Sequence, residues 1–191
     1  MLAAGLVLPG PAGALDKCVG ADGKVVYSDR GCAAGAKRAT VDGGVSLDGA
    51  QIEYYEVAGP GGHPGHTTWN VSYQFQSRPG ADGCRVASVS TKLEAKVRLP
   101  RLAAGASDPG GRWSGYLSAL QVHEAGHVQV GRDLESNFKR AALSLSAPDC
   151  GSLGAALRTQ FDGLYRQAIA RELDYDAQTS HGATQGALYR P

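Results

Sequence analysis

The sequence lacks the features that mark nucleic-acid-binding and membrane-spanning proteins. Its formal net charge is only +1 over 191 residues, so no excess of one sign indicates nucleic acid or an anionic membrane as a partner. No apolar run approaches the roughly 20 residues that a transmembrane helix requires. The hydrophobic fraction of 42% is nevertheless sufficient for a buried core. A chain of this length predicts one compact domain with a small appendage.

The first residues have the pattern of an export signal. A short apolar stretch at residues 2–8 precedes the small-x-small sequence Ala12-Gly13-Ala14. This pattern predicts a signal peptide over residues 1–14, cleaved after Ala14, and therefore a periplasmic or secreted protein. A buried N-terminal strand is the alternative interpretation of the same apolar stretch.

The four cysteines include no C-x-x-C pair, and that absence disfavours a four-cysteine zinc site. An even number of cysteines is typical of proteins in an oxidising compartment. Four cysteines allow three pairings. Proximity favours Cys18–Cys32 within the N-terminal segment and Cys84–Cys150 across the main domain.

The sequence of residues 15–45 predicts a small N-terminal hairpin module. Asp22-Gly23 is a strong two-residue turn, and a short apolar run follows it. So small a hairpin cannot hold a core alone, which would explain a Cys18–Cys32 disulfide. The segment LDKCVGADGKVVYSDRGC, residues 15–32, resembles the envelope module called domain of unknown function 4124. That family has no assigned chemistry, so the resemblance implies localisation in the cell envelope.

Residues 51–191 predict an α+β domain whose first half is a sheet. A strand is predicted over residues 52–57, and apolar and polar residues alternate over 69–76 and over 89–99. Each alternating segment has one polar face. This pattern is typical of an antiparallel sheet that is packed on one side.

The second half of this domain predicts two helices. Apolar residues recur at steps of three and four over 113–145 and again over 150–173. The short break at Ala147-Pro148-Asp149 predicts that the helices are antiparallel neighbours. The polar, glycine-dotted tail from Asp174 predicts a loop. The expected architecture is zincin-like, with an antiparallel two-helix unit on one side of the sheet.

The sequence His123-Glu124-Ala125-Gly126-His127 lies in the first of these helices. Histidines four residues apart on a helix differ by about 40° around its axis, so both can bind one tetrahedral zinc ion. Glu124 lies beside that position, which suits a general base for water. Both histidines fall in the apolar stripe, where a buried imidazole pair needs hydrogen-bond partners or a metal. Gly126 is unfavourable inside a helix, so it indicates close approach by a ligand or backbone, or tight packing.

A catalytic zinc ion usually has three protein ligands and one open position. We expect His181 to be the third ligand, because the second helix runs back to the level of His123 and the following loop would carry His181 to the metal. Glu172, near the end of the second helix, is the rival. The other candidates are expected to point away from the motif or to lie exposed in a loop: Asp133, Glu135, His63 and His66.

The segments RWSGYLSALQVHEAGHVQVGRD and YDAQTSHGATQGA occur in that order. Together with the preceding strands, they resemble the bacterial family of predicted zinc-dependent proteases called domain of unknown function 922, from about Gln51 to the C-terminus. The resemblance implies that His123 and His127 bind zinc and that Glu124 is the catalytic acid/base. It also implies His181 as a third ligand.

Three further residues have two interpretations each. Asp176 either orients a metal-binding histidine or is a turn residue at a helix end. Tyr175 and Tyr189 either donate a hydrogen bond to an oxyanion or are packing residues.

The sequence therefore predicts an exported zinc metallopeptidase that acts on peptide or protein substrates in the cell envelope. An amidase that uses the same zinc chemistry on another envelope amide is one alternative. A non-catalytic envelope module, in which zinc or plain packing holds the helices, is another.

Overall fold

The computed structural model describes residues 16–19, 25–28, 34–35, 37–39, 46–108 and 110–190. The chain divides into two compact units, residues 1–45 and 46–191. The predicted signal peptide over residues 1–14 and the predicted Cys18–Cys32 disulfide lie outside what is described.

The first unit contains a three-stranded sheet with the order β2-β1-β3. β1 (Asp16–Val19) pairs antiparallel with β2 (Val25–Ser28), from Asp16↔Ser28 to Val19↔Val25. This antiparallel pair lies within the segment for which a hairpin module was predicted. β3 (Lys37–Ala39) adds a further antiparallel strand on the other side of β1.

The second unit is α+β, and its sheet has the strand order β4-β6-β5. β5 (His66–Gly80) and β6 (Gly83–Leu102) form a long antiparallel hairpin. The short β7 (Ser146–Ala147) also pairs antiparallel with β6.

The sheet is mixed, because β4 (Gln51–Val57) runs parallel to β6. The expectation of a wholly antiparallel sheet is therefore wrong for β4. The alternation of apolar and polar residues is the same in both kinds of sheet, so it does not carry the direction of a strand. After β4, the chain passes through residues 58–65 and enters the sheet at its opposite edge as β5, so β4 has no hairpin connection to β6.

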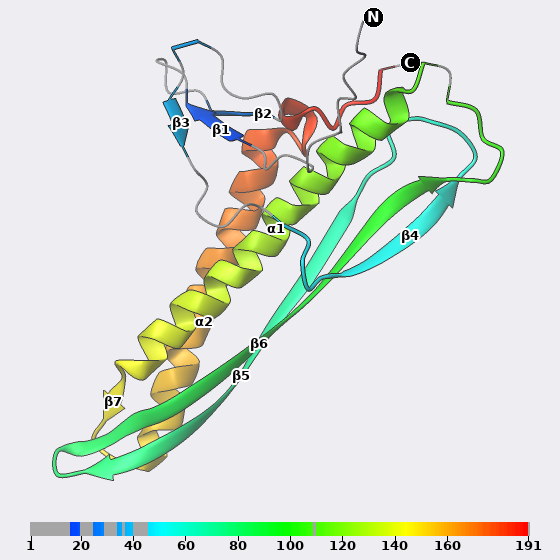
Figure 1. Cartoon of the computed structure of the whole chain (residues 1–191). Helices are drawn as coiled ribbons and strands as arrows, with labels where there is room; N and C mark the ends of the chain where they lie inside the picture. The colour runs from blue at the N-terminus through cyan, green and yellow to red at the C-terminus, as the bar shows by residue number, and fades with distance from the viewer. Residues whose placement is uncertain are drawn as a thin grey trace, which may run out of the picture. The chain divides into compact units, whose positions relative to one another are not determined.

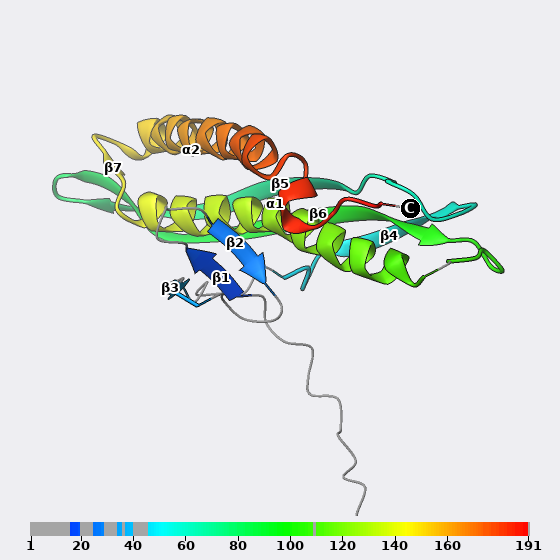
Figure 2. The same ribbon diagram turned by 90° about the horizontal axis from the view of Figure 1, so that it is seen from above.

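Two long helices follow the sheet: α1 (Arg112–Leu143) and α2 (Cys150–Thr179). α2 runs back along α1, as predicted, and η1 (Ala183–Gln185) follows it (Figures 1 and 2). The Asp149 side chain caps α2 by accepting a hydrogen bond from the Ser152 backbone N–H at 2.8 Å. Neither helix combines the length and the apolar composition that crossing a bilayer would require.

α2 continues to Thr179, beyond the end predicted at Leu173. The predicted loop from Asp174 is therefore wrong for its first residues. The additional turns are polar in sequence, but Thr179 is buried and Tyr175 packs against α1. Tertiary packing rather than an apolar pattern sustains this part of the helix.

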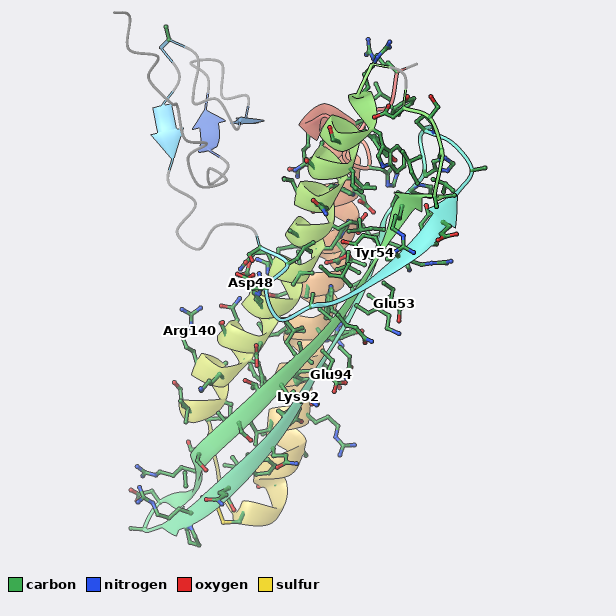
Figure 3. All side chains as sticks on the ribbon, turned by 45° about the vertical axis from the view of Figure 1, so that its right-hand side comes forward. Asp48, Glu53, Tyr54, Lys92, Glu94 and Arg140 are labelled. Atoms are coloured by element: carbon green, nitrogen blue, oxygen red, sulfur yellow. A yellow bond between two sulfur atoms is a disulfide. The ribbon has the colours of Figure 1, made fainter. Side chains whose placement is uncertain are left out.

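The core lies between the two helices and one face of the sheet. Near the start of α1, Val97 and Leu99 of β6 pack with Leu120. Towards the other end, Phe138 of α1 and Leu153 of α2 are fully buried against β6. The alternating burial along β6 leaves its other face exposed, where Lys92 and Glu94 form an ion pair at 2.6 Å (Figure 3). The predicted one-sided packing is confirmed.

A disulfide joins Cys84, at the start of β6, to Cys150, the first residue of α2, as the sequence predicted. The two cysteines are 66 residues apart in sequence. This bond fixes the end of the helical pair to the end of the sheet hairpin.

We expect Cys150→Ala to lower the free energy of unfolding by about 4 kcal/mol, because the crosslink restricts a long loop in the unfolded chain. Urea unfolding of the oxidised variant and of the wild type measures this loss. Ser152→Ala, two residues further along the same turn, is the control and should lose far less. A loss below about 1 kcal/mol in Cys150→Ala would contradict this role for the disulfide.

Candidate metal centre

A cavity of about 610 Å³ opens beside the histidine motif. Its floor is one face of α1, because residues three and four apart on a helix lie on the same side. Its walls are segment 62–67 at the start of β5, the end of α2 and segment 183–189. The α1 residues of the floor are Tyr116, Leu120, His123, Glu124 and His127.

Three buried or half-buried ligand-type atoms converge in this cavity. The Nε2 atoms of His123 and His127 are 3.3 Å apart. Asp176 Oδ1 of α2 lies 3.2 Å from His123 Nε2 and 3.1 Å from His127 Nε2. One ligand atom from each residue falls within 4.8 Å of the other two, a spacing that suits a single metal ion.

The opposite ring nitrogens of both histidines have partners that fix the rings. His127 Nδ1 lies 2.7 Å from Glu172 Oε2, and His123 Nδ1 lies 3.0 Å from Gln185 Oε1. Both oxygens are acceptors, so each Nδ1 carries the hydrogen in a neutral ring and each Nε2 is left as an acceptor. The amide of Gln185 is oriented by its Nε2, which donates to the Tyr175 hydroxyl at 3.1 Å.

Three acceptors therefore face one another with no hydrogen between them when both rings are neutral. Among the described residues, Asp176 Oδ1 is a buried side-chain atom without a hydrogen-bond partner. Burying an unpaired acceptor is unfavourable by roughly 1–3 kcal/mol, more for a charged group. A cation between the three atoms would remove this penalty.

A proton is the simplest cation that can occupy this place. Burial lowers the pKa of His123 and outweighs the opposing effect of the hydrogen bond that its Nδ1–H donates to Gln185. At His127, burial also lowers the pKa, but the hydrogen bond and charge of Glu172, together with Asp176, outweigh it and raise the pKa overall. His127 is therefore the ring that holds a proton against Asp176 most readily, and a metal ion would displace that proton.

Glu124 belongs to the same cavity floor as the two histidines, and its side chain is buried. Thr67 Oγ1 donates to Glu124 Oε2 at 2.6 Å. Burial raises the pKa of Glu124, against the effect of the Thr67 hydrogen bond. A Cβ atom at Gly65 would overlap this carboxylate, so the close approach of the loop depends on glycine.

Gly126 is in contact with a side chain of α2. A Cβ atom at Gly126 would overlap the ring and hydroxyl of Tyr175. The Tyr175 ring stacks on His123 with a centroid distance of 5.1 Å and meets His127 edge-on at 5.0 Å. Its hydroxyl donates to the backbone carbonyl of His123 at 3.1 Å. Tight packing thus explains this glycine, and Tyr175 holds both imidazoles in place.

His181, the predicted third ligand, lies at the edge of the cavity. Its side chain is 81% exposed, and its Nδ1 is 3.5 Å from Asp176 Oδ2. Asp176 instead occupies the place beside both Nε2 atoms, and Glu172 lies behind His127. Asp176 thus takes the place at the converging atoms for which Glu172 was the rival candidate, whereas the sequence suggested an orienting group or a turn residue for Asp176.

The remaining candidates supply none of the three converging atoms, although His66 lines the same cavity. His66 is exposed as expected, whereas His63 is half-buried against Trp113. Tyr189 packs edge-on against Tyr116 in the cavity wall. Asp133 lies outside the cavity and pairs with Arg171 of α2 at 3.3 Å.

Sequence reasoning missed the roles of Gln185 and Thr67. Thr67 is 57 residues from Glu124 in sequence, and only the topology of the sheet brings it to α1. The sequence does contain a signal for three further residues, because residues spaced by three and four share one face of a helix: Glu172, Tyr175 and Asp176. Recognising that face required knowing that α2 extends to Thr179.

We expect Gly126→Ala to lower the free energy of unfolding by about 1–3 kcal/mol, because the added methyl group displaces the Tyr175 ring. Gly115→Ala, in the same helix, is the matched control, since its Cβ atom would meet nothing within 4 Å. That variant should be neutral or more stable by up to about 1 kcal/mol. Urea unfolding measures both. Equal stability of the two variants would show that the contact between Gly126 and Tyr175 is not tight.

Comparison with known proteins identifies a family but no characterised relative. No curated protein matches the chain, and no solved structure does. Residues 48–182, well over half of the sequence, match the family described as "Bacterial protein of unknown function (DUF922)". The chain belongs to this bacterial family, domain of unknown function 922.

Proposed function

We propose that this protein is a zinc-dependent hydrolase that cleaves peptide amide bonds outside the cytoplasm. The observation that carries this proposal is the convergence of His123 Nε2, His127 Nε2 and Asp176 Oδ1, the last atom being buried and without a hydrogen-bond donor when both rings are neutral. The Cys84–Cys150 disulfide supports an oxidising compartment.

The donor set favours zinc over the common hard cations. Two imidazole nitrogens and one carboxylate oxygen form a typical set for catalytic zinc, whereas calcium and magnesium prefer oxygen ligands. Histidines that bind zinc usually donate their second ring N–H to a carboxylate or carbonyl oxygen. Glu172 and Gln185 accept such hydrogen bonds from His127 and His123.

Glu124 is the proposed acid/base. A bound zinc ion would supply a Lewis acid for the amide carbonyl and make water easier to deprotonate. Thr67 holds Glu124 Oε2 in place, and the carboxylate would accept the proton of the attacking water. The same carboxyl group would then pass this proton to the leaving nitrogen. A pKa raised by burial suits both steps, because the group must gain and lose a proton in one cycle.

Zinc titration of single variants tests the proposed ligand set. We expect Asp176→Asn to weaken zinc binding by more than the roughly 10- to 100-fold loss that is typical of residues behind the ligands. Glu172→Gln should fall within that range. Asp174→Asn, two residues away and exposed, is the control and should bind like the wild type. Isothermal titration calorimetry gives all the affinities.

The same titration compares Asp176 with His181. Wild-type affinity in Asp176→Asn, together with a large loss in His181→Ala, would assign the third ligand to His181. Absence of zinc binding in the wild type would contradict the metal centre altogether.

We expect Glu124→Gln to lower the rate of hydrolysis by roughly 10²- to 10⁴-fold, because the amide cannot accept the proton of the water. A fluorescence-quenched peptide library is the substrate, and zinc content is measured in the same samples. Glu135→Gln, on the same helix but outside the cavity, is the matched control. Full zinc content with no hydrolysis in the wild type would favour a non-catalytic role for the metal.

A further inference from the structure

The cavity has two chemically different halves. One half contains the histidines, Asp176 and Glu124. The other lies towards the start of α1 and is lined by apolar and aromatic residues. These residues are Pro64, Tyr116, Leu120, Ala187, Leu188 and Tyr189.

The apolar half adjoins the catalytic half directly. Leu120 precedes Glu124 by one helical turn, about 6 Å along α1, and Tyr116 precedes it by about 12 Å. Neighbouring residues of an extended peptide are separated by about 3.3 Å along the chain. A residue next to the amide bond at Glu124 can therefore place its side chain over Leu120.

The walls of this half are fixed and uncharged. Tyr116 donates its hydroxyl hydrogen to the His63 carbonyl, and burial raises the pKa of Tyr116 to about 12, so the group stays neutral. The Tyr189 ring packs edge-on against both Tyr116 and Trp113. A charged substrate group here would lose hydration without gaining a partner from these walls.

The rim of this half exposes apolar surface. Leu188, which lines this half, is 50% exposed. Apolar surface that is continuous with a catalytic cleft is typical of a site that a ligand covers.

We propose that this apolar half binds an aliphatic or aromatic side chain of the substrate residue next to the scissile amide bond. The preferred substrates are thus peptides with a leucine- or phenylalanine-like residue beside the cleaved bond. This inference rests on the proposed zinc-dependent hydrolysis, since it places the scissile bond at Glu124 and the metal.

Binding of hydroxamates, which ligate zinc, tests the pocket without any turnover. Three compounds that differ in one side chain (methyl, isobutyl or carboxymethyl) are titrated into the zinc-loaded protein by calorimetry. We expect the isobutyl compound to bind at least about tenfold tighter than the other two, in line with the contribution of a few methylene groups in an apolar pocket.

Leu188→Asp should abolish this preference, because it places a carboxylate at the rim. Leu143→Asp is the matched control, since Leu143 is also 50% exposed but lies at the end of α1, outside the cavity. That variant should keep the preference of the wild type.

Equal binding of all three hydroxamates, or an unchanged preference in Leu188→Asp, would overturn the apolar pocket and leave the zinc-dependent hydrolase standing. Failure of zinc or of every hydroxamate to bind would overturn both. The two results are therefore distinguishable.

Discussion

The contact between Gly126 of α1 and Tyr175 of α2 determines the geometry of the whole centre. Because Gly126 has no side chain, the Tyr175 ring lies directly on α1 and stacks on His123. This close approach brings the next residue, Asp176, within 3.2 Å of both Nε2 atoms. A helix pair held further apart would separate the carboxylate from the imidazoles.

The rest of the unit holds this helix pair against the sheet. The disulfide from Cys84 to Cys150 ties the start of α2 to the start of β6, at the end of the helix pair far from the centre. At the other end, the chain from β4 crosses to the opposite edge of the sheet, and the start of β5 supplies Thr67 to Glu124. The mixed sheet thus contributes to the site, because the connection from β4 to β5 brings Gly65 and Thr67 to α1.

The sequence predicted the features that depend on local periodicity. The strands around Val71 and Val97, both helices and the pairing of His123 with His127 follow from spacing alone. The Cys84–Cys150 bond was one of three possible pairings, the one favoured by proximity in the sequence. The sequence did not predict what tertiary packing decides. The alternation of apolar and polar residues in β4 does not show that the strand is parallel to β6. The last turns of α2 are polar, so their sequence resembles that of a loop. Because the end of α2 was predicted too early, Asp176 was not expected on the helix face that meets the two histidines. Glu172 and the loop residue His181 were considered as ligands in its place.

Anomalous diffraction from crystals of the zinc-loaded protein, recorded on both sides of the zinc edge, tests the central claim most directly. The account predicts one peak about 2.0–2.2 Å from His123 Nε2, His127 Nε2 and an Asp176 carboxylate oxygen. A zinc peak ligated by His181, with the Asp176 carboxylate turned away from it, would contradict the ligand set. The absence of any peak between the two histidines in crystals grown with excess zinc would contradict the metal centre itself.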